Sequence, residues 1–172
     1  MSILETAKVR HSVRKYLPQK VEQEKLLLVL EAGRVAPTGC NYQPQRLIVV
    51  QSEEGLNRLF KACINFGAPL AIIVCGDNNN VWHRQCDDKS ILDIDVSIVT
   101  AQMMLQATEL GLGSLWMCKF DPDIIRSEFN LPDNVVPINI LWLGYEAGPP
   151  LSPDRHDTMR KPLDQTVFYE TM

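Results

Sequence analysis

The chain has 172 residues, of which 45% are hydrophobic and 22% charged, a composition typical of a folded protein and unlike that of disordered or collagen-like chains. This length suits one domain with a substantial core, so we expect a single domain over 1–172. The formal net charge of -4 at pH 7 gives no overall attraction to nucleic acid or anionic membranes. An anionic partner would therefore need a local cluster of cations.

Cellular context is predicted from two further features. No apolar run approaches the roughly 20 residues that cross a bilayer, and the N-terminus lacks the regions of a signal peptide. The five cysteines include no C-x-x-C pair, which argues against a disulfide framework and a zinc ribbon. We therefore expect a cytoplasmic protein with reduced thiols that binds small molecules.

The first half of the chain is predicted to contain both helices and strands. Ser2 and Glu5 have the spacing of a capping box, which predicts a short helix through about Val9. The further elements expected in this half are a helix over 22–34, a strand over 46–51, a helix capped by Ser52 and a strand over 70–75.

The second half begins with a polar stretch over 76–90, which is predicted to be a surface loop. A long helix is expected over 91–110, because apolar residues recur there at helical spacing. The elements expected next are a strand over 114–117, a helix that starts at Asp121-Pro122 and ends near Phe129, and a strand over 135–145. Residues 166–169 could form an edge strand or part of an arm that reaches another subunit.

The order of these elements favours one fold class. Two helices precede the first strand, and the connections between strands are uneven in length. A mixed sheet with helices on both faces suits this order better than a strict βαβ alternation.

A local excess of positive charge lies near the N-terminus. Between Thr6 and Val21 there are five Lys or Arg residues and no carboxylate. Within this stretch Arg10, Ser12 and Arg14 offer two guanidiniums and a hydroxyl, and guanidinium forks match phosphate oxygens in charge and geometry. A phosphate site is one interpretation, and a solvated helix end is the other.

Two other stretches are candidates for ligand contacts. The loop 36–44 is rich in small and amide residues, so it could hydrogen-bond a flat polar ligand or serve as a plain connector. The run 155–163 is a second basic cluster, which could complete a phosphate site or remain an exposed tail.

Several familiar sites are excluded or disfavoured. Gly111 and Gly113 follow a helix and precede a strand, the reverse of a Rossmann fingerprint. His83 and Cys86 lack a second ligand pair at suitable spacing, so we expect no metal site. The sequence also contains no nucleophile elbow, Walker loop or H-E-x-x-H motif.

Four motifs, taken in order, resemble the nitroreductase family of FMN enzymes. They are RHSVR at 10–14, APTGCNYQP at 36–44, ELGLGSLWM at 109–117 and RKPL at 160–163. The resemblance spans nearly the whole chain. It implies an α+β fold with a mixed, mainly antiparallel sheet sandwiched between helices, and an interlocked homodimer with flavin sites at its interface. Residues 151–172 would be an exchanged C-terminal arm.

The same resemblance assigns residues to parts of the cofactor. The phosphate and ribityl chain would be held by Arg10, Ser12 and Arg14, with His11 beside them and Arg160 or Lys161 adding a further cation. The loop along the ring of the partner chain's flavin would contain Pro37, Thr38, Gly39, Asn41 and Gln43. The strand against the ring would contain Leu115, Trp116, Met117 and Cys118, and the backbone N–H of Cys118 would face flavin N5.

The chain departs from the commoner family pattern at two places. Gly39-Cys40 stands where serine or alanine is usual, and Gln45 follows Pro44 where an aromatic residue is common. These differences predict a more open or more polar pocket edge. The polar contacts to the flavin pyrimidine are not assigned within 61–65 or 76–89.

The function that follows from the resemblance is electron transfer from NADH or NADPH to a small acceptor, such as a nitroaromatic or a quinone. The flavin would carry the chemistry at N5, so no catalytic side chain is expected, and the kinetics would be ping-pong. One alternative is a protein that stores, senses or fragments flavin without turning over a nicotinamide. Another is an interaction module that uses the basic patch and binds no flavin.

Overall fold

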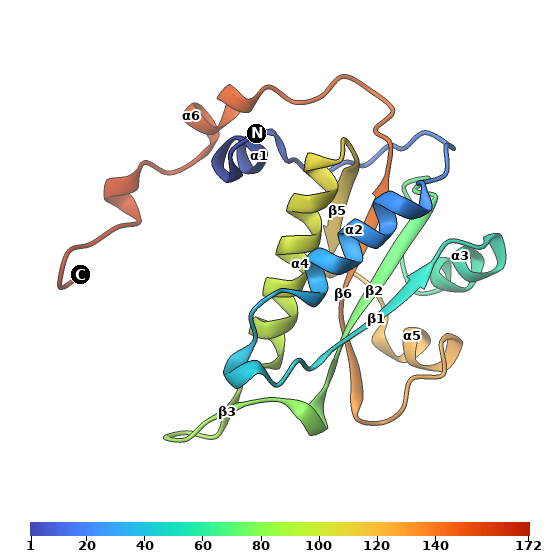
Figure 1. Ribbon diagram of the computed structural model, residues 1–172, viewed down its shortest axis with the longest axis horizontal. Coiled ribbons are helices and arrows are strands. Elements are labelled where there is room, and N and C mark those ends of the chain that lie inside the picture. Colours follow the sequence, from blue (N-terminus) through green and yellow to red (C-terminus); the bar gives the residue numbers. More distant parts are fainter.

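The computed structural model describes residues 1–172, and its centre is a four-stranded antiparallel sheet in the order β1-β2-β6-β5, with helices on both faces (Figure 1). The strands are β1 (Gln45–Val50), β2 (Leu70–Asp77), β5 (Gly113–Met117) and β6 (Val135–Gly144), and β3 (His83–Arg84) and β4 (Lys89–Ser90) form a separate hairpin. The helices are α1 (Ile3–Val9), α2 (Gln23–Arg34), α3 (Glu53–Phe60), α4 (Leu92–Glu109), α5 (Pro122–Glu128) and α6 (His156–Met159).

Both faces of the sheet are packed against helices. In β2, Leu70, Ile72 and Val74 belong to a core shared with α2 and α4. Ala71, Ile73 and Cys75 belong to a second core, shared with α3 and α5. Because successive side chains of a strand point to opposite faces, the continuous apolar run of β2 supplies both cores.

Local sequence signals set several helix starts. The capping box of Ser2 and Glu5 is formed, and Ser52 accepts a hydrogen bond from the backbone N–H of Gly55. Asp121 caps α5 with Pro122 in its first turn. The predicted helices at these positions are confirmed.

The predicted α+β class, with a mainly antiparallel sheet between helices, is also confirmed. The four named strands pair only antiparallel, and the parallel component is a single bridge between Ser12 and Ser114. One detail differs from the expectation, because the stretch 76–90 contains the β3–β4 hairpin. Of the two alternatives for residues 166–169, the edge strand is not formed.

The C-terminal segment is anchored by hydrogen bonds to the end of α1 of the same chain. Arg155 donates to the carbonyl of Arg10 at 2.7 Å, and His156 Nε2 lies 3.1 Å from the carbonyl of Lys8. The positive charge of Arg155 is favourable at the C-terminal end of a helix because the free carbonyls there carry partial negative charge. Beyond this anchor residues 161–172 are exposed, and Figure 1 shows them extending away from the sheet. Their exchange with a second copy stays a prediction.

None of the helices combines the length and apolar character needed to span a membrane.

A buried polar pair between α4 and β6 generates a stability prediction. Thr100 and Asn139 are fully buried and hydrogen-bonded to each other at 3.1–3.2 Å. Thr100→Val removes the hydroxyl and leaves the Asn139 amide short of a partner, which costs about 1–3 kcal/mol. Urea unfolding should show this loss, and Thr100→Val with Asn139→Leu should recover part of it. A Thr100→Val variant as stable as the wild type would contradict the prediction.

Candidate functional site

Side chains from the two ends of the chain line one cavity of about 320 Å³, called here the basic cavity. Its lining residues are Arg10, His11, Ser12, Arg14, Leu151, Arg155, His156, Met159 and Arg160. None of its four arginines takes part in an ion pair with a carboxylate. Four unneutralised guanidiniums around one hollow make a site for an anion.

Arg10 shows the electrostatic cost of this arrangement. Burial, followed by repulsion from Arg155 and Arg160, lowers the pKa of its guanidinium. One guanidinium nitrogen of Arg10 lies 4.0 Å from the sulfur of Met104, where no negative charge compensates it. An anion in the basic cavity would relieve this repulsion.

Backbone hydrogen bonds fix the arginine-bearing segment. The N–H of Val13 donates to the carbonyl of Ser114 at 3.0 Å, and the N–H of Leu17 donates to the carbonyl of Tyr145 at 2.8 Å. Val13 and Tyr16 are buried by this pairing, whereas Arg14 between them stays exposed. Arg14 and Lys15 therefore face outward between the two buried side chains.

His11 lies at the edge of the basic cavity and has partners of its own. Its Nε2 lies 2.8 Å from a carboxylate oxygen of Glu146, and its Nδ1 lies 3.2 Å from the carbonyl of Val9. Both ring nitrogens therefore face acceptors from the same chain. His11 holds the segment in place more directly than it offers a donor to a ligand.

Of the two C-terminal cations predicted to contact the phosphate, Arg160 lines the basic cavity and Lys161 does not. Arg155 was not among the predicted cofactor ligands. It lines the cavity while its guanidinium donates to the carbonyls of Arg10 and Ser152. The signal that could have found it was the basic run 155–163, in which sequence alone does not distinguish one cation from another.

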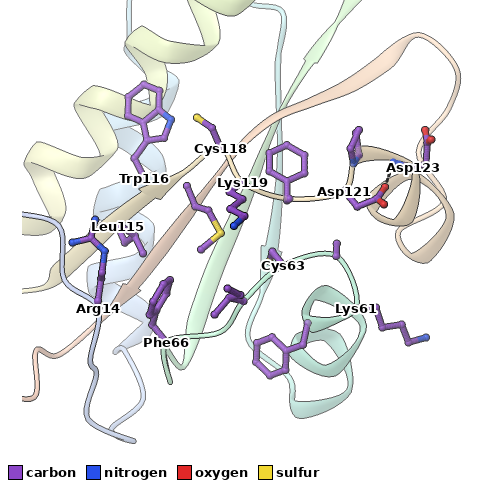
Figure 2. A pocket seen from close by; sticks show the side chains of 16 residues that line it. Arg14, Lys61, Cys63, Phe66, Leu115, Trp116, Cys118, Lys119, Asp121 and Asp123 are labelled. Atoms are coloured by element: carbon purple, nitrogen blue, oxygen red, sulfur yellow. Dashed lines mark hydrogen bonds between the residues drawn. The ribbon is translucent and has the colours of Figure 1, made fainter.

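A second, larger cavity of about 1050 Å³ lies at the end of β5 and is called here the strand-end cavity (Figure 2). It includes the predicted strip Leu115, Trp116, Met117 and Cys118. Its other lining residues are Arg14, Phe60, Lys61, Ala62, Cys63, Ile64, Phe66, Lys119, Phe120, Asp121, Pro122 and Asp123. Burial raises the pKa of the Cys63 thiol to about 11, so this thiol is protonated near neutral pH. Arg14 is the one residue that lines both cavities.

The predicted loop Pro37, Thr38, Gly39, Asn41 and Gln43 lines neither cavity of its own chain. It holds an unusual backbone, because Cys40, Asn41 and Gln43 have positive φ angles of 47°, 57° and 52°. Non-glycine residues in this region are strained, and such strain gathers at ligand-binding segments. The role of this loop toward a partner's cofactor stays a prediction.

Asp95 on α4 holds the loop and was not identified from the sequence. One carboxylate oxygen accepts from the backbone N–H of Gly39 at 2.9 Å, the other has no partner, and the side chain is only 2% exposed. A Cβ atom at Gly39 would lie 2.4 Å from Ile91 Cδ1. A side chain at this position would therefore have to displace the end of the Ile91 side chain. The sequence signal that could have identified Asp95 is the presence of an acidic residue within a largely apolar helix.

Sequence comparisons connect this chain with named proteins. The profile of the Nitroreductase family matches residues 7–72 and 63–145. A "Putative NADH dehydrogenase/NAD(P)H nitroreductase" from Methanothermobacter thermautotrophicus is 31% identical, over 96% of this chain and 88% of the relative.

Solved structures agree with the sequence comparisons. A nitroreductase family protein from Clostridium difficile 630 is 59% identical with a TM-score of 0.98, over 100% of both chains. An FMN-dependent nitroreductase from Clostridium difficile R20291 is 27% identical with a TM-score of 0.78, over 98% of this chain and 99% of that one. The predicted family and the oxidoreductase class are confirmed. On sequence, fold and the position of its motifs, the chain belongs to the nitroreductase family.

Proposed function

We propose that the protein binds FMN and passes electrons from NADH or NADPH to a small acceptor such as a nitroaromatic or a quinone. The observation that carries this proposal is the basic cavity, where arginines from both ends of the chain converge without carboxylate partners. In a chain of net charge -4, this cluster is suited to one compact anion.

The two cavities fit the two ends of FMN. A phosphate matches the guanidiniums of Arg10 and Arg160, and the Ser12 hydroxyl can donate to it. A flat, largely apolar ring matches the strand-end cavity, which shares Arg14 with the basic cavity. A ligand with a phosphate at one end and a ring at the other fits this pair of cavities.

When bound, FMN would supply the redox chemistry that links the nicotinamide donor to the acceptor. The chain's own residues would bind the cofactor and orient it. Arg10, Arg14 and Arg160 hold the anionic end, and residues 115–118 support the ring. Because donor and acceptor would use the same hollow in turn, we expect ping-pong kinetics.

The proposal includes a homodimer. The loop 37–43 is preformed and strained, yet it lines neither the basic cavity nor the strand-end cavity of its own chain, so a second copy is its natural recipient. A separate hollow of about 460 Å³ between α1, α2 and α4 is lined by exposed apolar residues including Ile3, Leu28 and Val35. Apolar surface of this kind is typical of protein interfaces. Leu163 and Phe168 on the terminal segment are exposed apolar side chains as well.

Relatives support the proposal through their names. One structural relative is called FMN-dependent, and several sequence relatives are named NADH dehydrogenases or NAD(P)H nitroreductases. The names of the relatives include both NADH and NADPH as donors, and their acceptors range from nitro compounds to an enone.

The first prediction concerns the purified protein. It is expected to be yellow, with absorption near roughly 450 nm from oxidised flavin, and to bleach when NADH or NADPH is added without oxygen. Stopped-flow mixing measures the bleaching. A protein that keeps its colour with both nicotinamides would be a flavin store or sensor. A colourless protein that takes up no added FMN would contradict the proposal altogether.

The second prediction concerns the arginines near the N-terminus. Arg10→Ala with Arg14→Ala removes two guanidiniums from the basic cavity and should weaken FMN binding by about 100-fold or more. Fluorescence titration of the apoprotein measures the affinity. Arg34→Ala is the matched control, because Arg34 is exposed and pairs with Glu31 on α2. Equal FMN affinity in the double variant and the control would contradict the assignment.

The third prediction tests whether each site is shared between copies. Asp95→Leu removes the acceptor of Gly39 N–H and should lower activity by loosening the loop, whereas Asp95→Asn keeps an acceptor oxygen and should be milder. The Asp95→Leu chain and the Arg10→Ala, Arg14→Ala chain are unfolded together and refolded. Random pairing then leaves about a quarter of the sites intact. Activity no higher than the average of the two variants would contradict a shared site.

A further inference from the structure

The strand-end cavity is larger than one ring requires. Its volume of about 1050 Å³ slightly exceeds the range of about 300–1,000 Å³ that is typical of sites for drug-sized ligands. Beyond the strip 115–118 it continues between the C-terminal end of α3 and the start of α5. This part of the cavity lies outside the strip that the proposed function assigns to the ring.

Two of the charged groups around this part are already engaged. The ammonium of Lys61 pairs with Glu128 at 2.7 Å. The carboxylate of Asp121 accepts hydrogen bonds from the backbone N–H groups of Asp123 and Ile124 at 3.0 and 3.2 Å. Neither group is free to bind a ligand without losing these partners.

Lys119 differs from both. It follows Cys118 directly, lines the cavity, and its ammonium takes part in no hydrogen bond or ion pair with the chain, including with Asp123. Figure 2 shows its side chain pointing from the end of β5 toward the middle of the cavity. Lys119 therefore places an unpaired positive charge between the ring strip and the rest of the cavity.

We propose that Lys119 selects ligands that carry an anionic group beside the reacting ring. This inference rests on the function proposed above. The anionic group would be either a phosphate of the nicotinamide donor or a carboxylate on the acceptor, since an ammonium attracts both. In this arrangement Arg14 binds the cofactor, and Lys119 binds the molecule that exchanges electrons with the cofactor.

The test compares matched anionic and neutral reactants in the flavin-loaded enzyme. The acceptor pair is 4-nitrobenzoate and 4-nitrobenzamide, and the donor pair is NADH and 1-benzyl-1,4-dihydronicotinamide. For Lys119→Met, the ratio of kcat/KM for the anionic member over the neutral one should fall roughly five- to tenfold in at least one pair. The pair that responds identifies whether the acceptor or the donor supplies the anion.

Controls separate charge from other effects. Lys119→Arg keeps the charge and should keep the wild-type ratios, and the wild-type preference should shrink as salt is raised. Lys20→Met removes a lysine that lines neither the basic nor the strand-end cavity and should leave every ratio unchanged. Unchanged ratios in Lys119→Met would overturn the proposal. Equal slowing of both members of each pair would also overturn it, because the effect would then act through the cofactor.

The bound flavin of each variant is measured first by its absorbance. A wild-type protein that holds FMN and is reduced by NADH, with no change in the ratios on Lys119→Met, refutes only the role of Lys119. A wild-type protein that binds no FMN refutes the proposed function itself.

Discussion

Repulsion among guanidiniums that lack carboxylate partners is the physical constraint on which the proposed site depends. Arg10 is partly buried beside Arg155 and Arg160, and both burial and repulsion lower its pKa. A folded chain tolerates such a cluster when an anion completes it, because isolated buried charge is costly. The basic cavity is therefore the part of the structure that an anionic ligand would stabilise most.

The fold supplies the rigidity that this cluster needs. The segment carrying Arg14 is hydrogen-bonded to β5 on one side and to the residues after β6 on the other. The C-terminal cations are brought to the same place by Arg155 and His156, which hold the end of α1. Both ends of the chain are thus fixed to one edge of the sheet. That edge also carries the strip 115–118, so the anionic and ring-shaped parts of a ligand meet one rigid frame.

Sequence reasoning found the elements well, because caps and apolar periodicity are local signals. The capping box of Ser2, the cap of Asp121 and the buried run of β2 each correspond to an element of the structure. Contacts between residues far apart in the sequence were harder to predict. Asp95 holds Gly39 across 56 positions, and Arg155 reaches the carbonyl of Arg10 across 145, and no local pattern encodes either contact. The order of the motifs predicted approximately where the site lies. Which residues line it depends on how distant segments pack together.

The most direct measurement compares FMN with riboflavin, which has the same ring and lacks the phosphate. We expect the apoprotein to bind FMN at least about 100-fold more tightly, since each charge-assisted hydrogen bond contributes about 1.5–3 kcal/mol. Calorimetric titration of wild type and of Arg10→Ala with Arg160→Ala would show this preference and its loss in the variant. Equal affinity of the wild type for FMN and riboflavin would contradict a phosphate site in the basic cavity.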